Sequence, residues 1–209
     1  SGEFVYDGEE KSVTGYTTQI SDPNYSEDNF TYSGTAEAKG TEVGKYDLVL
    51  DQSALTNNNP NYEVTFEVNP GQLEITPITD EIKIIANSNT QVYNGEVLSD
   101  DGYKVEGRLP EGYEVVAVVE GSQTDVGSTE NKVTSYKIVD ADGNEVTDKF
   151  TNVTTVDGTL TVTPKPVTVT LTGNSGEFVY DGEEKSVTGY TTEISDPAYT
   201  TDNFTYSGT

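Results

Sequence analysis

Apolar and polar residues alternate with a period of two in several short runs of this chain. The alternation runs through residues 46–51, 71–76 and 167–172, and it is longest in residues 62–68, where Tyr62, Val64, Phe66 and Val68 share one face. Because successive side chains of a strand point to opposite sides, this pattern predicts strands with one buried and one wet face. No window sustains a helical period, and one short helical turn is predicted near residues 51–55.

Turn signals separate these runs. An Asp-Gly pair supplies the positive φ that a tight turn needs, so residues 4–11 and 139–146 each predict a β-hairpin. Turn signals recur every ~8–12 residues, which is typical of β-sandwiches of immunoglobulin-like type. The chain has no Cys or Trp, so the likeness to immunoglobulins is one of architecture. The prediction is an all-β chain of small sandwich domains arranged end to end.

The chain repeats itself. Residues 1–35 recur as residues 175–209 with four differences, and Tyr6, Tyr93 and Tyr180 open the motif Tyr-Asp/Asn-Gly at intervals of 87 residues. Self-similarity at a fixed period is the signature of repeat architectures. Two types of unit therefore alternate, with a true period of 174 residues.

Three regions follow from this repeat. Residues 1–77 are predicted to be a type A repeat that lacks its first strand, residues 78–164 a complete type B repeat, and residues 165–209 the start of a second type A repeat. The segment 167–172 has the sequence of the strand that the first repeat lacks, which predicts head-to-tail self-association of the chain. The connector 163–166 contains two prolines and no glycine, so we expect a stiff joint, an elongated array and small contacts between domains.

Composition narrows the possible functions. The chain carries 37 acidic and 11 basic residues for a net charge of −26, and the acidic residues are spread along its whole length. Such charge keeps tandem domains soluble. It argues against nucleic acid and anionic membranes as partners, because both need basic surfaces. No run is apolar enough for insertion into a membrane.

Catalysis is poorly supported, because the chain has no His and no Cys and the common pairings of nucleophile and base are missing. The metal-site candidates are Asp140 and Asp142, in a loop that superficially resembles a calcium loop but lacks its spacing and terminal Glu. Two further acidic loops contain Asp22, Glu27 and Asp28, and Asp100 and Asp101. No cofactor is predicted, and calcium is the one alternative left open. A polar hairpin turn is the preferred interpretation of residues 139–146.

Two other residue types remain candidates. Tyrosines and a phenylalanine gather at Tyr16, Tyr25, Phe30 and Tyr32; exposed aromatic rings can stack on sugars, but a chain without Trp needs them for its core. Lys83 is the one lysine considered for an isopeptide cross-link to an Asn side chain. No ligand-binding residue is assigned.

Four motifs follow one another in residues 1–77 and recur in altered form in residues 78–164. In the first copy they are Val-Tyr-Asp-Gly, Thr-Glu-Val-Gly-Lys-Tyr, Asn-Pro-Asn-Tyr-Glu-Val and Gly-Gln-Leu-Glu-Ile-Thr-Pro. In this order they resemble the MBG or YDG-type repeats of large cell-wall adhesins and mucus-binding proteins of Gram-positive bacteria. The resemblance implies an extracellular, wall-anchored, multi-domain protein. It transfers no catalytic or ligand-binding residue.

Two functions are therefore expected. The first is a non-catalytic stalk that projects a distal binding domain of an adhesin from the cell. The alternative is that the repeats themselves bind host mucin, another glycan or an extracellular protein, through avidity.

Overall fold

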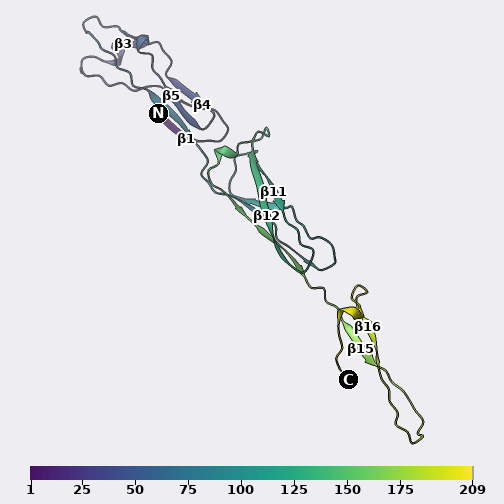
Figure 1. Cartoon of the computed structure of the whole chain (residues 1–209). Helices are drawn as coiled ribbons and strands as arrows, with labels where there is room; N and C mark the ends of the chain where they lie inside the picture. The colour runs from purple at the N-terminus through teal and green to yellow at the C-terminus, as the bar shows by residue number, and fades with distance from the viewer. Residues whose placement is uncertain (209) are drawn as a thin grey trace.

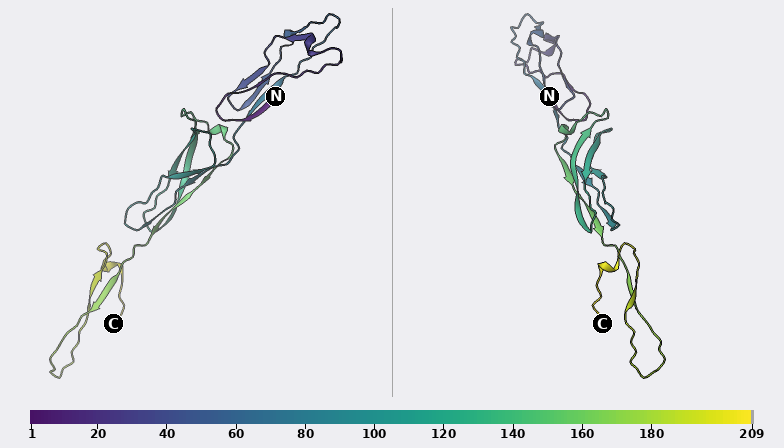
Figure 2. Two further views of the ribbon diagram at one scale, coloured as in Figure 1. Left: turned by 180° about the vertical axis from the view of Figure 1, so that it is seen from behind. Right: turned by 45° about the vertical axis from the view of Figure 1, so that its right-hand side comes forward.

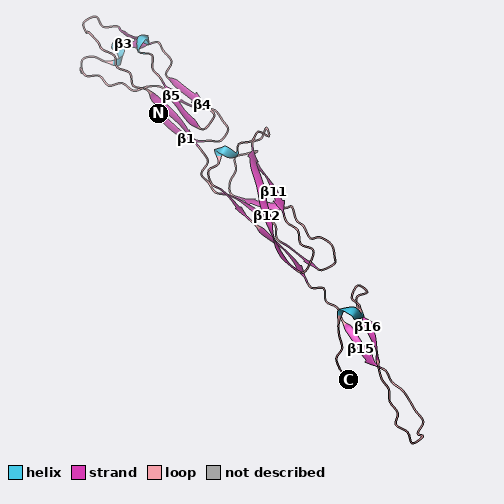
Figure 3. Ribbon diagram, viewed as in Figure 1, coloured by secondary structure: helices cyan, strands magenta, loops and turns pink. Residues whose placement is uncertain are grey.

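A computed structural model describes residues 1–208 as three regions arranged end to end (Figure 1). Two further views confirm the elongated shape (Figure 2). The described residues form strands, short 3₁₀ turns and loops, and contain no α-helix (Figure 3). The prediction of an all-β chain of tandem small domains is confirmed. None of the helical turns in this part of the chain is long and apolar enough to cross a membrane.

The first region is built around strand β7 (Gly71–Thr76). This strand pairs in parallel with β1 (Gly2–Val5) and antiparallel with β5 (Gly44–Leu48). Two smaller antiparallel pairs join β2 (Lys11–Thr14) to β4 (Glu37–Gly40) and β3 (Phe30–Tyr32) to β6 (Leu55–Asn57). The 3₁₀ turns η1 (Glu27–Asn29) and η2 (Gln52–Ala54) precede β3 and β6.

The second region has two sheets. The smaller places β8 (Ile82–Ala86) between β10 (Tyr103–Glu106) and β13 (Val153–Val156). The larger has the order β11 (Glu114–Glu120), β12 (Gly127–Val139), β14 (Gly158–Thr163) and β9 (Asn89–Val92). Turn η3 (Thr147–Lys149) lies before β13. The third region contains the antiparallel pair β15 (Val169–Gly173) and β16 (Tyr190–Ile194) and turn η4 (Thr201–Asn203).

The pairing of strands repeats with the sequence. Gly2 lies opposite Leu73 in the parallel pair β1·β7, and the residues 87 positions later, Asn89 and Leu160, lie opposite each other in β9·β14. The antiparallel pair β8·β10 is repeated in the same way by β15·β16. The repeated amino-acid sequence therefore specifies a repeated register of strand pairing.

Alternation in sequence becomes alternation in burial. Leu73 and Ile75 of β7 are 0% and 2% exposed, and their counterparts Leu160 and Val162 of β14 are 0% and 1% exposed. The intervening residues are half-buried or exposed. The prediction of half-buried strands is confirmed for these runs, and the helical turn predicted near residues 51–55 is η2, capped by the Asp51 carboxylate, which accepts from Ser53 N.

The hairpin predicted for residues 4–11 is wrong. Its turn exists, with Gly8 at φ +86°, but β1 pairs with β7 and β2 pairs with β4, so the turn joins strands of different sheets. An alternating pattern on both sides of a turn reveals two strands without revealing their partners. The second predicted turn is hairpin-like, since Val139 and Glu145 form an antiparallel bridge.

The strand predicted for residues 62–68 is not formed, although its side chains alternate as expected between half-buried and exposed. Residues 66–69 correspond to β13 of the second region, 87 residues later, which is held by pairing with β8. Within the described part of the first region, no strand lies at the position of β8, so this segment has no ladder to join.

Candidate functional site

The joint between the first two regions is the first site of interest. It is centred on Tyr6, which follows β1 in the repeated motif. The Tyr6 N–H donates to Thr76 O at 2.9 Å, extending the β1·β7 ladder by one bond. Its side chain is 5% exposed, because residues of the second region cover it.

Three residues of the second region make this cover. The Tyr113 hydroxyl lies 3.5 Å from that of Tyr6 in a long hydrogen bond, and the Lys149 ammonium lies 5.9 Å from the centre of the Tyr6 ring, within reach of a cation–π interaction. Phe150 packs edge-on against Tyr113 with ring centroids 6.4 Å apart. Lys149 also forms a 2.7 Å ion pair with Glu42 of the first region. A cationic and a polar contact therefore meet at Tyr6, and Phe150 and Glu42 hold the two residues that make them.

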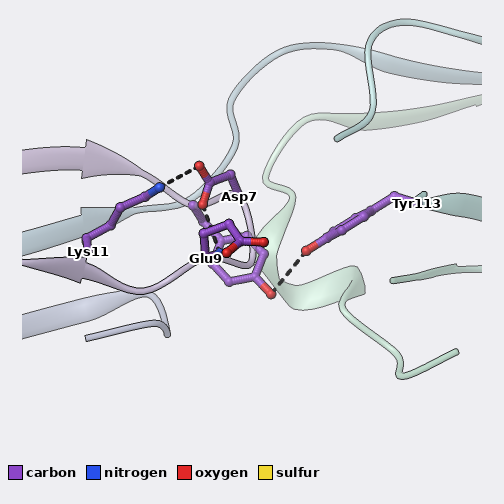
Figure 4. A network of polar contacts seen from close by, with 5 residues as sticks. Asp7, Glu9, Lys11 and Tyr113 are labelled. Carbon is purple, nitrogen blue, oxygen red and sulfur yellow. Dashed lines mark hydrogen bonds and ion pairs between the residues drawn. The ribbon is translucent and has the colours of Figure 1, made fainter. Parts of the chain in front are cut away.

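A hydrogen-bonded turn follows Tyr6. The Asp7 carboxylate accepts from Glu9 N at 3.0 Å and from the Lys11 ammonium at 2.6 Å (Figure 4). Gly8 adopts a left-handed conformation, and a Cβ added there would lie 2.5 Å from the Tyr113 hydroxyl oxygen. Glycine is thus required both by the φ angle and by the close approach of the second region.

The joint shifts the pKa of several groups. Burial raises the pKa of Tyr113 and its hydrogen bond with Tyr6 raises it further, so this phenol stays protonated. The hydrogen bond to Glu42 raises the pKa of Lys149 against the opposing effect of burial. Burial also acts to raise the pKa of Asp7, but the hydrogen bonds from Lys11 and Glu9 outweigh it and hold this pKa below its usual range.

The apolar core continues through the joint. A single cluster of buried side chains includes Ile75 of the first region, Ile78 at the boundary and Ile82 of the second region. The backbone of Ile78 is fixed by bonds from its N–H to Lys149 O at 2.8 Å and from Thr151 N to its own carbonyl at 3.0 Å. The prediction of small contacts between domains is wrong at this joint, because a continuous core links the two regions.

The second junction is more open. Tyr93 occupies the position of Tyr6, and its N–H makes the equivalent bond to Thr163 O at 2.8 Å, yet its side chain is 39% exposed. Residues 164–168 form no strand. Lys165 pairs with Asp196 within the third region.

A groove of about 540 Å³ in the first region is the second site of interest. Its walls are two segments outside any strand, residues 16–22 and 62–68. Aromatic side chains form much of its lining, in the contacting pairs Tyr16–Tyr32, Tyr25–Phe30, Tyr25–Tyr62 and Phe30–Phe66.

The predicted tyrosine cluster is thus both core and surface. Tyr25 is 8% exposed, and its hydroxyl donates to Asn29 O or Asn57 Oδ1 at 3.1 and 2.9 Å. Tyr16 is 46% exposed at the groove.

The structure places Asp140 in a closed polar turn. Its carboxylate accepts from Asp142 N at 2.9 Å and from Asn144 N at 2.8 Å. The Asn144 side chain also donates to it at 3.1 Å. Asp140 is half-buried and Asp142 is exposed.

The other acidic loops are likewise held by local hydrogen bonds. Asp22 accepts from Asn24 N at 2.8 Å, Glu27 accepts from the Thr18 hydroxyl, and Asp100 accepts from Gly102 N at 2.9 Å. Asp28 and Asp101 are exposed in these loops. Across residues 1–208, no three acidic side chains are grouped as metal ligands. Calcium binding stays a prediction.

Lys83 lies on β8 with its side chain 37% exposed, and its ammonium is 3.9 Å from Glu81. Its neighbours on the same strand, Ile82 and Ile84, are fully buried, so Lys83 lies on the opposite face of β8. An isopeptide bond at Lys83 has no support in these contacts.

Comparison with known families decides the identity of the first region. The family model of the MBG domain matches residues 1–77. The first region is an MBG domain. No curated protein and no solved structure matches the chain.

MBG domains occur in bacterial surface proteins and are usually non-catalytic. The second region repeats the strand register of this MBG domain at 87 residues, as described above. Sequence reasoning found the motif but missed the joint and the groove. The motif itself carries no signal for the joint, because the same tyrosine recurs as Tyr93 and Tyr180 with an exposed side chain.

Proposed function

We propose that this chain is a non-catalytic spacer from the stalk of an adhesin anchored to the cell wall of a Gram-positive bacterium. In this role it lies outside the cell and projects a distal binding domain. The membership of residues 1–77 in the MBG family supports this proposal, since that domain is a repeat of bacterial surface proteins.

The observation that carries the proposal is the packed joint. A stalk holds a distal domain away from the cell only if its own domains cannot fold back on one another. The buried Tyr6 ring, the Lys149–Glu42 ion pair and the continuous core through Ile78 fix the direction of the second domain relative to the first. Interfaces between domains of one chain are commonly mobile unless they are apolar and well packed.

Uniform negative charge suits the same role. The net charge of −26 is distributed over all three regions, so neighbouring stalks repel one another and neighbouring domains do not collapse together. The ion pair at the joint removes one such repulsion where contact is needed.

Residual dipolar couplings measured by NMR test the spacer. We expect residues 1–77 and 78–164 to share one alignment tensor, as two domains of a rigid rod must. Separate tensors for the two domains would show free motion at the joint and contradict the proposal. The same measurement on Tyr6→Ala serves as a positive control for loosening.

The second candidate function is that the repeats bind host mucin glycans. The aromatic lining of the groove favours it, since Tyr16 exposes nearly half of its surface there and exposed rings stack on sugars. A glycan array and a mucin pull-down with the whole chain test this candidate. Saturable binding that Tyr16→Ala abolishes would replace the pure spacer with a binding module.

A further inference from the structure

The first and last segments of the second domain run side by side. The first, residues 78–93, contains β8 and β9, and the last, residues 149–163, contains β13 and β14. β8 pairs in parallel with β13 and β9 pairs in parallel with β14, with four residue pairs in each ladder. These two stretches are the terminal segments of the domain.

Hydrogen bonds join the terminal segments along their whole length. At one end Ile78 N donates to Lys149 O at 2.8 Å, and at the other Tyr93 N donates to Thr163 O at 2.8 Å. Side chains add further bonds between the same segments, from Thr151 to Ile78 O, from Asn152 to Thr79 O, from Thr154 to Glu81, from Thr159 N to Ser88 Oγ and from Thr163 to Gln91 O.

The terminal segments cross from one sheet to the other together. β8 and β13 belong to the smaller sheet, and β9 and β14 belong to the larger one. At the crossing, Gly158 lies so close to Asn87 that a Cβ on the glycine would be 2.1 Å from Asn87 O. The fully buried Asn131 of β12 donates to the same carbonyl at 2.9 Å. Sliding of one segment past the other would therefore have to break contacts in both sheets.

Three of these bonds recur 87 residues earlier, in the first domain. They join Tyr6 N to Thr76 O, Gln72 N to Ser1 Oγ and Thr76 Oγ1 to Phe4 O. The side chains that take part, Ser1 and Thr76, recur as Ser88 and Thr163 in the second domain. The repeat thus preserves the contacts between its terminal strands.

Parallel pairing places the entry and the exit of the second domain at opposite ends of the paired segments. The chain enters at Ile78, beside the first domain, and leaves after Thr163, on the side of the third region (Figure 1). Strands β11 and β12 run along the long axis of the array in the same view, and β14 and β9 continue their sheet. Tension along the array therefore pulls the terminal segments lengthwise in opposite directions, and all the bonds between them are loaded at once.

We propose that the paired terminal segments make this domain load-bearing, so that it resists tension along the axis of the array. The proposal rests on the spacer role, which supplies the tension, because a stalk between a cell and a bound surface is stretched whenever the two move apart. Forced unfolding is governed by the barrier to unfolding. In this geometry that barrier includes the simultaneous rupture of ladders in both sheets.

Optical tweezers test the proposal on the whole chain by changing only the direction of pull. The chain has no Cys, so two introduced cysteines are the only handles. Asp80→Cys with Pro166→Cys stretches the second domain alone and pulls its terminal segments lengthwise. Glu96→Cys with Pro166→Cys pulls on the neighbouring ends of β9 and β14 and peels these strands apart. All three handle positions are exposed.

We expect the second domain to unfold at a severalfold higher force when it is pulled lengthwise than when it is peeled. Peeling breaks the bonds of the β9·β14 ladder one after another, whereas the lengthwise pull loads them together. Equal forces in the two directions, or a lower force in the lengthwise one, overturn the proposal.

Two matched double variants, both pulled lengthwise, identify the contacts that carry the load. Ser88→Ala with Thr163→Val removes two side-chain bonds between the terminal segments. Ser128→Ala with Thr134→Val makes the same two replacements on β12 and removes its side-chain bonds to β14 and β11. Both should lose a similarly small amount of stability in urea, but only the first should lower the unfolding force. Equal changes in force, or none in the first variant, overturn the proposal.

These results are independent of the test of the spacer. Separate alignment tensors for the first two domains, together with a high lengthwise force, would contradict the spacer alone. A shared tensor, together with equal forces in the two directions, would contradict the load-bearing role alone.

Discussion

One residue of the repeated motif has three environments. Tyr6, Tyr93 and Tyr180 are 5%, 39% and 93% exposed, although the same turn follows each of them. The turn is local and follows from Asp-Gly or Asn-Gly in the sequence. The burial of Tyr6 comes from Tyr113 and Lys149 of the second domain, so it could not be predicted from the motif.

The three tyrosines provide a stability test with its own controls. Tyr6→Ala should reduce the free energy of unfolding by about 3 kcal/mol, because a large buried ring is removed and the surroundings relax only partly. Urea unfolding followed by tyrosine fluorescence measures this change. Tyr180→Ala, at a nearly fully exposed position, should change stability by no more than about 0.5 kcal/mol; equal losses for both variants would contradict the described joint.

Acid should loosen the turn at Asp140. Hydrogen bonds from the side chain and backbone of Asn144 hold the pKa of Asp140 below its usual value. A depressed pKa in the folded state contributes stability that is present above the unfolded value of about 3.9 and is lost as the pH falls through the folded value.

Comparison with Asp140→Asn isolates this effect from the general relief of charge repulsion in acid. The parent should be more stable than the variant at pH 7, and the difference in urea midpoint should shrink below about pH 4. A difference that stays constant down to pH 2 would show that the carboxylate does not support the turn.

At the scale of elements, the sequence predicts strands better than it predicts their partners. The alternating residues 71–76 form strand β7, because β1 and β5 pair with it on its two sides. The equally clear alternation in residues 62–68 gives no strand, since no strand among the described residues pairs with this segment. Pairing depends on distant segments, and a local pattern does not contain that information.

Two equivalent glycines test how tightly the repeats are built. Gly158 begins β14, and a Cβ there would lie 2.1 Å from Asn87 O, whereas a Cβ at the equivalent Gly71 would meet Leu48 Cβ at an ordinary 3.5 Å. Gly158→Ala should destabilise the chain by about 1–3 kcal/mol through overpacking. Gly71→Ala should be neutral or slightly stabilising, because it restricts the unfolded chain. Thermal unfolding of the two variants measures the contrast, and equal effects would refute it.

At the scale of the whole molecule, the repeat and the end-to-end array could be predicted, because a period of 87 residues is visible in the letters. The candidate sites could not. The joint combines Tyr6 and Glu42 with Tyr113 and Lys149, which are more than 60 positions further along the chain. The groove lies between residues 16–22 and 62–68, which are distant from each other in the sequence. The acidic loops singled out from the sequence form local turns instead.

Small-angle X-ray scattering, extrapolated to zero concentration, tests the elongated array most directly. A compact domain of this length would have a radius of gyration of about 17 Å. The account predicts a radius well above that value and a distance distribution with a long tail, as for a rod of consecutive domains. A radius near 17 Å with a symmetric distribution would show that the domains fold back on one another, and it would contradict the stalk.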